Sequence, residues 1–126
     1  MKIDVSIGEV IDKATILHIK LQKIKDEAKR RNIRHEYDLI SDCMEEVSIS
    51  TESEDFKFLL EVNQTLWEIE DRIRIKEKDK QFDAEFIELA RSVYLNNDKR
   101  ADLKKKINLK FGSDLVEEKE YADYSK

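Results

Sequence analysis

The chain has 126 residues, of which 42% are charged and 40% hydrophobic, and it contains two glycines, no proline and one cysteine. This length predicts a single domain, residues 1–126, with a substantial core. A composition rich in helix formers and poor in turn residues predicts an all-α fold. The net charge of −5 disfavours binding to nucleic acid or to an anionic membrane. The lone Cys43 excludes a disulfide framework and a cysteine metal cluster.

The sequence shows no signal-peptide pattern and no long apolar run. We therefore expect a soluble, cytoplasmic protein without a membrane partner. The charge is uneven, because residues 19–34 hold seven Lys or Arg and two acids, whereas residues 41–55 hold six acids and no base. We interpret these runs as solvated helix faces that attract one another within the fold or across a dimer, with a phosphate-binding surface as the alternative.

The first helix has a clear start. Residues 1–5 alternate apolar and polar side chains, which predicts a short extended segment. Ser6 followed by Glu9 has the spacing of a capping box, so a helix is predicted from there to about Lys25. Its apolar stripe has helical spacing and consists of Val10, Ala14, Leu17, Leu21 and Ile24.

A second helix is predicted from an N-cap at Asp26 to about Val47. No glycine or proline separates it from the first helix, so one bent helix over residues 7–47 is the alternative. The polar residues 48–55 are predicted to form a loop. Thr51 and Glu54 are predicted to form a capping box at the start of the next helix.

Residues 56–74 contain the only tryptophan and are predicted to form the central helix. One of its faces is apolar and carries Leu59, Val62, Leu66, Ile69 and Ile73. The adjacent row has the same spacing and a mixed character, with Phe56, Leu60, Asn63, Trp67, Glu70 and Arg74. An apolar stripe beside such a polar row is typical of a helix in the middle of a bundle.

A fourth helix is predicted to begin at an N-cap at Asp83 and to end before Gly112, which suits the C′ position. After it, residues 113–126 form an acidic tail, in which Tyr121 and Tyr124 are expected to dock the segment.

Polar residues interrupt the apolar stripe of this fourth helix. If the helix runs unbroken to about Lys110, Asn96, Asn97 and Arg100 lie within its core stripe. Either Asn97 or Asp98 caps a new helix, or polar groups face the interior.

Polar residues of the third and fourth helices are the candidate ligand-binding residues. If the two helices are antiparallel neighbours, this set converges on one cavity: Asn63, Trp67, Glu70, Arg74, Tyr94, Asn97 and Arg100. Arginine donates two parallel hydrogen bonds to a carboxylate or phosphate, so the cavity suits an anion. The alternative is an internal Glu–Arg/Asn network that fixes helix register, because buried charges must be paired. Catalytic residues are not assigned.

A metal site was tested against the acidic residues. The pair Glu85 and Glu88, with Asp98 and Asp102 further on, resembles the Glu-x-x-Glu pairs that hold Mg²⁺ in all-helical nucleotide pyrophosphohydrolases. Such pairs also arise by chance in a chain with 29 acids, and a first helical turn favours acids. The sequence therefore predicts no metal and no cofactor.

Four blocks of the sequence resemble a family of small uncharacterised proteins of bacteria and their phages, whose members often lie among polysaccharide-assembly genes. The blocks are VSIGEVIDKATILHIKLQKI (5–24), LWEIEDRIR (66–74), FDAEFIELARSVYLNNDKRADLKKKIN (82–108) and GSDLVEEKEYADY (112–124). The resemblance implies a shared helical fold and no established activity. Polar residues within the blocks include Glu9, Asp12, Lys13, Glu70, Asp71, Arg74, Asn97, Asp98 and Arg100. A looser similarity is to the all-helical type of chorismate mutase, which binds a dicarboxylate with Arg, Lys and Glu.

The sequence thus predicts an antiparallel bundle of four to five helices that forms a homodimer through its long stripes. The leading functional hypothesis is a non-catalytic binding or accessory module that works through a helical surface, with a protein partner or a small anionic ligand. The alternative is a small-molecule enzyme or anion-binding protein that uses the polar pocket between the third and fourth helices. A pocket requires a concave, solvent-accessible site, whereas an interaction module requires an exposed apolar patch.

Overall fold

The computed structural model describes residues 1–124, which form four α-helices without a strand. Their bounds are α1 Ile7–Lys23, α2 Glu27–Glu46, α3 Glu54–Lys78 and α4 Ala84–Lys110. The all-α prediction is confirmed. The last two residues of the predicted tail, 125 and 126, lie outside the described residues. Among the described helices, none combines the length and the apolar character needed to cross a membrane.

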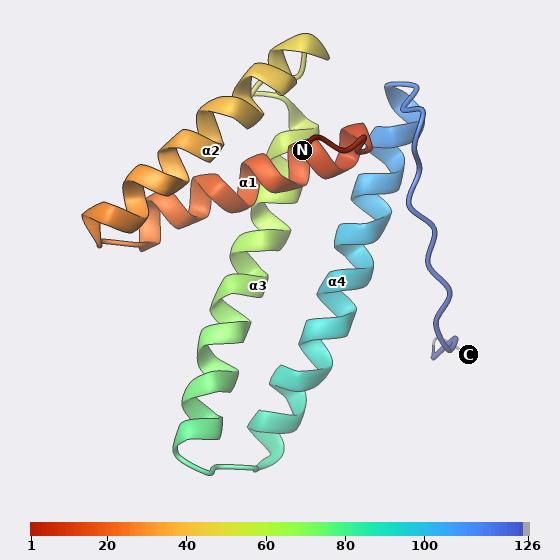
Figure 1. The fold of residues 1–126 in the computed structure, drawn as a ribbon. Helices are drawn as coiled ribbons and strands as arrows, with labels where there is room; N and C mark the ends of the chain where they lie inside the picture. The colour runs from red at the N-terminus through yellow and green to blue at the C-terminus, as the bar shows by residue number, and fades with distance from the viewer. Residues whose placement is uncertain (125–126) are drawn as a thin grey trace.

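The helices form two crossed hairpins. α1 and α2 make a short hairpin, and α3 and α4 make a longer one (Figure 1). α1 crosses the upper part of the long hairpin and packs against both α3 and α4, whereas α2 packs on α1. The lower half of the long hairpin extends beyond α1 (Figure 1). α1 is the helix that contacts all three others.

Side-chain caps start the first, second and fourth helices where the sequence predicts them. The backbone N–H groups of Glu9, Lys29 and Phe86 donate to the side chains of the N-caps Ser6 (3.1 Å), Asp26 (2.9 Å) and Asp83 (3.0 Å). Because the chain leaves helical geometry at residues 24–26, residues 7–47 form two helices rather than one bent helix.

The predicted cap of the third helix at Thr51 is wrong. Ser53 is the N-cap, and its hydroxyl accepts from the N–H of Phe56 at 3.2 Å. A tight turn causes the difference, because the N–H and the hydroxyl of Ser53 both donate to the carbonyl of Ser50. Both Thr51 and Ser53 have the chemistry of a cap, and the turn places Ser53 at the helix start.

α4 runs without a break through Asn96, Asn97 and Asp98, so these polar residues lie within one helix. It ends where the sequence predicts, at Gly112, whose φ of 65° is the left-handed conformation that glycine adopts without steric cost. The N–H of Ser113 then donates to the carbonyl of Asn108 at 2.8 Å, which completes a Schellman motif.

The core lies where α1, α3 and α4 meet. Ile11, Ala14, Phe56, Leu59 and Ile107 come from these three helices and are at most 1% exposed. Burial of large aliphatic and aromatic side chains of this kind contributes about 1.5–3 kcal/mol each. The core therefore holds α1 across the long hairpin and positions the polar residues beside it.

Candidate functional site

A buried carboxylate lies next to the core. Asp12 of α1 is 0% exposed, and it accepts hydrogen bonds from the side chains of α3 and α4. Asn63 donates to Oδ1 at 2.9 Å, Arg100 Nε donates to Oδ1 at 2.8 Å and Arg100 Nη2 donates to Oδ2 at 2.5 Å. A buried charge is tolerated when it is paired and hydrogen-bonded in this way. One carboxylate thus joins all three helices.

Asn63 and Thr15 extend this network. The second N–H of the Asn63 amide donates to Thr15 Oγ1 at 2.8 Å, and the Thr15 hydroxyl donates to the carbonyl of Asp12 at 2.7 Å. Both amide protons of Asn63 are therefore in use, and its carbonyl oxygen remains as an acceptor. Asn63 and Arg100 thus share an internal network whose carboxylate is Asp12, whereas the sequence predicted a glutamate in that role.

The start of α1 is docked on the end of α4. The N–H of Ile7 donates to Ser113 Oγ at 3.1 Å, and the N–H of Gly8 donates to Asn108 Oδ1 at 2.6 Å. A Cβ atom added to Gly8 would lie 2.6 Å from the carbonyl oxygen of Lys104, so only glycine permits this approach. The first N–H groups of a helix need such partners, and here Asn108 of α4 and Ser113, just beyond its end, supply them.

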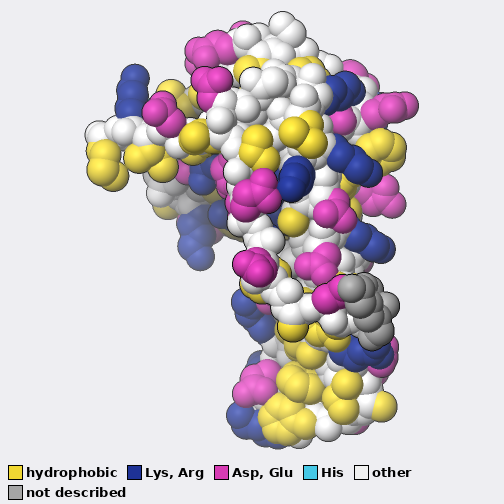
Figure 2. Space-filling view, turned by 90° about the vertical axis from the view of Figure 1, so that its right-hand side faces the viewer, with side chains coloured by type: hydrophobic (Ala, Val, Ile, Leu, Met, Phe, Trp, Pro, Cys, Tyr) yellow, Lys and Arg dark blue, Asp and Glu magenta, His cyan; other side chains and the backbone are white. Residues whose placement is uncertain are grey.

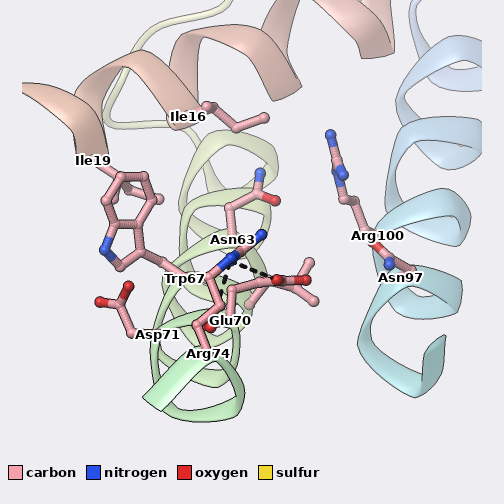
Figure 3. A pocket seen from close by; sticks show the side chains of 10 residues that line it. Ile16, Ile19, Asn63, Trp67, Glu70, Asp71, Arg74, Asn97 and Arg100 are labelled. Carbon is pink, nitrogen blue, oxygen red and sulfur yellow. Dashed lines mark hydrogen bonds and ion pairs between the residues drawn. The ribbon is translucent and has the colours of Figure 1, made fainter. Parts of the chain in front are cut away.

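An open groove of about 390 Å³ crosses the face of α3 below α1. Figure 3 shows Trp67 at one end of the groove and Arg100 of α4 at the other, with Asn63 and Glu70 between them. Ile16 and Ile19 of α1 form an apolar roof. The remaining lining residues are Leu66, Asp71, Arg74 and Asn97.

The structure brings together six of the seven candidate residues in this groove: Asn63, Trp67, Glu70, Arg74, Asn97 and Arg100. Tyr94 does not line it. This residue packs instead against Tyr124 of the C-terminal segment, with ring centroids 5.3 Å apart. The reason is helical phase, because Tyr94 lies on the same side of α4 as Asp98, which also contacts Tyr124.

The guanidinium of Arg100 is held in place by Asp12 and keeps N–H groups that do not bind Asp12. Its side chain is 28% exposed, whereas that of its partner Asp12 is 1% exposed. The hydrogen bond to Asp12 raises the pKa of the Arg100 guanidinium, so it stays charged. Two of its five N–H groups bind Asp12, and the others are available to a molecule in the groove.

The other charges of the groove lie on α3. Glu70 and Arg74 form an exposed ion pair at 2.7 Å, drawn with dashed lines in Figure 3. Asp71 adds a further carboxylate to the lining. The α4 end of the groove is therefore a cationic hydrogen-bond donor, and the α3 side offers carboxylate oxygens.

Asp12, Thr15 and Asn108 also take part in this arrangement, and the sequence did not predict them as site residues. Gly8, Asp12 and Thr15 recur at steps of four and three, which is one helix face beside the predicted stripe. A row of small and polar residues at that spacing marks a face that packs closely on another helix. The sequence does not show which helices pack on this face, because their contacting residues are far away in the chain.

The two glutamates of the Glu-x-x-Glu pair both lie in ion pairs with arginines. Glu85 is paired with Arg72 at 2.8 Å, and Glu88 is paired with Arg91 at 2.9 Å. Within residues 1–124, no group of three or more His, Cys, Asp or Glu side chains is placed to hold a metal ion.

The fold and the groove define a small all-α protein in which a buried aspartate–arginine pair supports a polar, solvent-open groove. The chain belongs to a family of unknown function, DUF6165, which it matches over residues 1–125. This confirms the resemblance to an uncharacterised family. Comparison with curated proteins and comparison with solved structures gave no match.

Proposed function

We propose that the protein is a non-catalytic binding module that holds a small molecule with an acidic group in the groove between α1, α3 and α4. The observation that carries this proposal is the position of Arg100. Its guanidinium is locked by the buried Asp12 and still faces the groove with unused N–H groups. A donor fixed before binding loses little side-chain entropy when the ligand arrives.

The lining residues indicate the chemistry of the ligand. A carboxylate or phosphate fits the end formed by Arg100 and Asn97, where arginine donates in a bidentate geometry. Glu70 and Asp71 repel a second anionic group and accept hydrogen bonds from a hydroxyl or an ammonium group. We therefore infer a ligand with one acidic group at one end and donor groups at the other.

Binding rather than catalysis is favoured by how the charges are used. Arg100 is committed to Asp12, and Glu70 is committed to Arg74. These pairs hold and orient groups, which is what recognition of a bound molecule requires. The groove volume of about 390 Å³ lies within the range of small-molecule sites, which is about 300–1,000 Å³.

The single tryptophan makes the test direct. Trp67 is the only tryptophan and lines the groove, so its fluorescence reports directly on occupation of this site. Titration with acetate, L-phenylalanine, glucose 1-phosphate and glucose is expected to change the emission with the three acidic compounds and not with glucose. Asn97→Ala should weaken binding at least about tenfold, because a single hydrogen bond to a charged group contributes roughly 1.5 kcal/mol or more.

A matched control is Asn32→Ala, which removes the same side chain from an exposed position on α2, a helix that does not line the groove. This variant is expected to bind as the wild type does. If no acidic compound changes the emission at millimolar concentration, or if both variants respond as the wild type does, the groove is not the binding site.

A second candidate is an accessory module that acts through a helical surface. Figure 2 shows hydrophobic side chains gathered at the lower end of the molecule, where α3 turns into α4. Ile75, Phe82 and Ile87 are 58%, 56% and 55% exposed there. Exposed apolar patches of this kind mark interaction sites. Because the sequence predicts a homodimer, the partner proposed for this patch is a second copy of the chain.

Sedimentation equilibrium tests the dimer. The wild type is expected to be dimeric at micromolar concentration, and Ile87→Glu is expected to be monomeric with an unchanged helix content. A monomeric wild type would remove this candidate and leave the groove proposal untouched. A cytoplasmic location and a bacterial or phage source remain predictions of the sequence and of its family resemblance.

A further inference from the structure

A second cavity adjoins the groove below the C-terminal segment. Its volume is about 280 Å³, and it shares Asn97 and Arg100 with the groove. The other polar side chains around it are Glu9 of α1, Lys104 of α4 and the tail residues Glu117 and Lys119. Arg100 is therefore a common wall of two cavities, and the second one is rich in cations.

Lys104 is the main cation of this cavity and is nearly buried, with 9% of its side chain exposed. Its ammonium group lies 2.8 Å from Glu9 and 3.1 Å from Glu117. Burial works to lower the pKa of Lys104, but hydrogen bonds to these two carboxylates outweigh it and the pKa is raised. A nearly buried ammonium that is kept charged is an effective binder of oxyanions.

Glu117 fills this cavity with a carboxylate. One of its oxygens contacts Lys104 and the other lies 3.7 Å from Lys119. The hydrogen bond to Lys104 lowers the pKa of Glu117, so the carboxylate is ionised. Without it, the cations Arg100, Lys104 and Lys119 would face only Glu9 and the buried Asp12, which leaves one positive charge uncompensated.

The segment that carries Glu117 lies on the surface. Residues 114–124 contain no helix or strand and run alongside α4 (Figure 1). Side-chain contacts attach the segment to α4, among them the exposed pair of Glu118 with Lys105 at 3.2 Å and the edge-to-face contact of Tyr124 with Tyr94. A segment held by exposed side-chain contacts opens at a low free energy compared with a packed helix.

We propose that the cavity around Lys104 and Arg100 is a second binding site for carboxylates, and that Glu117 occupies it as an internal stand-in for the ligand. A carboxylate-bearing molecule competes with Glu117 and releases residues 114–124 from α4. The tail thus covers a site that becomes available when the ligand displaces it. This inference does not depend on the proposed function of the groove, because Lys104 and Glu117 line this cavity and not the groove.

Malonate binding to the full-length chain tests the proposal. The probe carries two carboxylates, which suits the two lysines that contact Glu117. Two-dimensional NMR at constant ionic strength follows the amides of residues 97–104 and the side-chain signals of Lys104. Glu117→Gln removes the competing carboxylate and is expected to bind malonate at least about fivefold more tightly than the wild type, because a tethered group competes at millimolar or higher effective concentration.

Glu120→Gln is a matched control, because it makes the same change in charge three residues further along. Glu120 is exposed and does not line the cavity. Its affinity for malonate is expected to equal that of the wild type. Equal gains in the two variants, or an absence of malonate shifts at residues 97–104 in Glu117→Gln, would overturn the proposal. Circular dichroism confirms that both variants are folded.

Discussion

The carboxylate of Asp12 and the guanidinium of Arg100, 88 residues apart in the chain, are joined by two hydrogen bonds of 2.8 and 2.5 Å. The pair is asymmetric in exposure, because the Asp12 side chain is 1% exposed and that of Arg100 is 28% exposed. Asp12 therefore depends on Arg100 for its compensation, whereas Arg100 has N–H groups left for a ligand. Fold stability and the candidate site consequently share one residue.

Arg100→Ala is expected to lower the free energy of unfolding by about 3–5 kcal/mol, because it leaves a buried carboxylate without its partner. Urea denaturation measures this loss. The double variant Asp12→Ala, Arg100→Ala should lose less than the sum of the two single variants, since each removes the same interaction. Arg74→Ala, at an exposed groove residue, should change stability by about 0.5 kcal/mol or less. Additive losses for Asp12 and Arg100 would show that they do not act as a pair.

Gly8→Ala is expected to destabilise the fold although alanine is the better helix former. The new Cβ would meet the backbone carbonyl of Lys104 at 2.6 Å, and a close contact of this kind costs about 3 kcal/mol. The gain in helix propensity is about 1 kcal/mol, so a net loss of about 2 kcal/mol is expected in urea denaturation. The side-chain amide signals of Asn108 should shift as well. Unchanged stability would mean that α1 does not approach α4 this closely.

Gly112→Ala serves as the control for this prediction. A Cβ at Gly112 has no heavy atom within 4 Å, but its φ of 65° is left-handed. Alanine at this conformation costs about 1–2 kcal/mol through backbone strain. The Asn108 side-chain amide should not shift, which separates strain at the helix end from a lost contact between α1 and α4.

The start of α3 gives a third prediction. Ser53→Ala is expected to cost about 1 kcal/mol of stability, because it removes the acceptor for the N–H of Phe56. Thr51→Ala should lie within about 0.5 kcal/mol of the wild type, since Thr51 is exposed in the preceding loop. Thermal unfolding of the two variants distinguishes them. A larger effect at Thr51 than at Ser53 would reinstate the capping box that the sequence suggests.

The contact between Glu117 and Lys104 predicts a pH window for docking of the C-terminal segment. The pKa of Glu117 is lowered, so its contribution is present above its ordinary value of 4.5 and is lost as the pH falls through the folded value. The pKa of Lys104 is raised, so its contribution is present below 10.5 and is lost as the pH rises through the folded value. Amide hydrogen exchange of residues 117–124 is therefore expected to be slowest, after correction for the intrinsic rate, between these two limits.

Glu117→Gln should flatten both limbs of this dependence, because each limb reports the ion pair of Glu117 with Lys104. The corrected exchange of the wild-type segment would be independent of pH if the two side chains did not hold it. The hydrogen bond of Tyr124 to Asp98 raises the pKa of this phenol to about 12, so Tyr124 stays neutral throughout the window.

Local signals in the sequence predicted the helices well, because caps and stripes act within a few residues. Ser6, Asp26, Asp83 and Gly112 each mark a helix end by their own side chain or backbone preference. The cap at Ser53 was missed because Thr51 is an equally good cap in isolation and only the turn between them decides.

The α3 and α4 residues of the candidate site could be predicted from the sequence, whereas its α1 residue Asp12 could not. The polar residues of α3 and α4 share one helical spacing, and antiparallel neighbours bring them together without further information. Asp12 was missed because its pairing with Arg100 depends on how α1 crosses the long hairpin, which no local pattern encodes. Tyr94 was included because its helical phase relative to the groove is set by the same packing.

The most direct test of the central claim is a two-dimensional NMR map of where the tightest-binding acidic compound of the fluorescence titration binds. If Arg100 and its neighbours form the site, the largest shifts are expected at the indole N–H of Trp67 and at the side-chain amides of Asn97 and Asn63. Shifts confined to residues 75–87, or spread evenly over the surface, would contradict the claim that the groove held by Asp12 and Arg100 is the binding site.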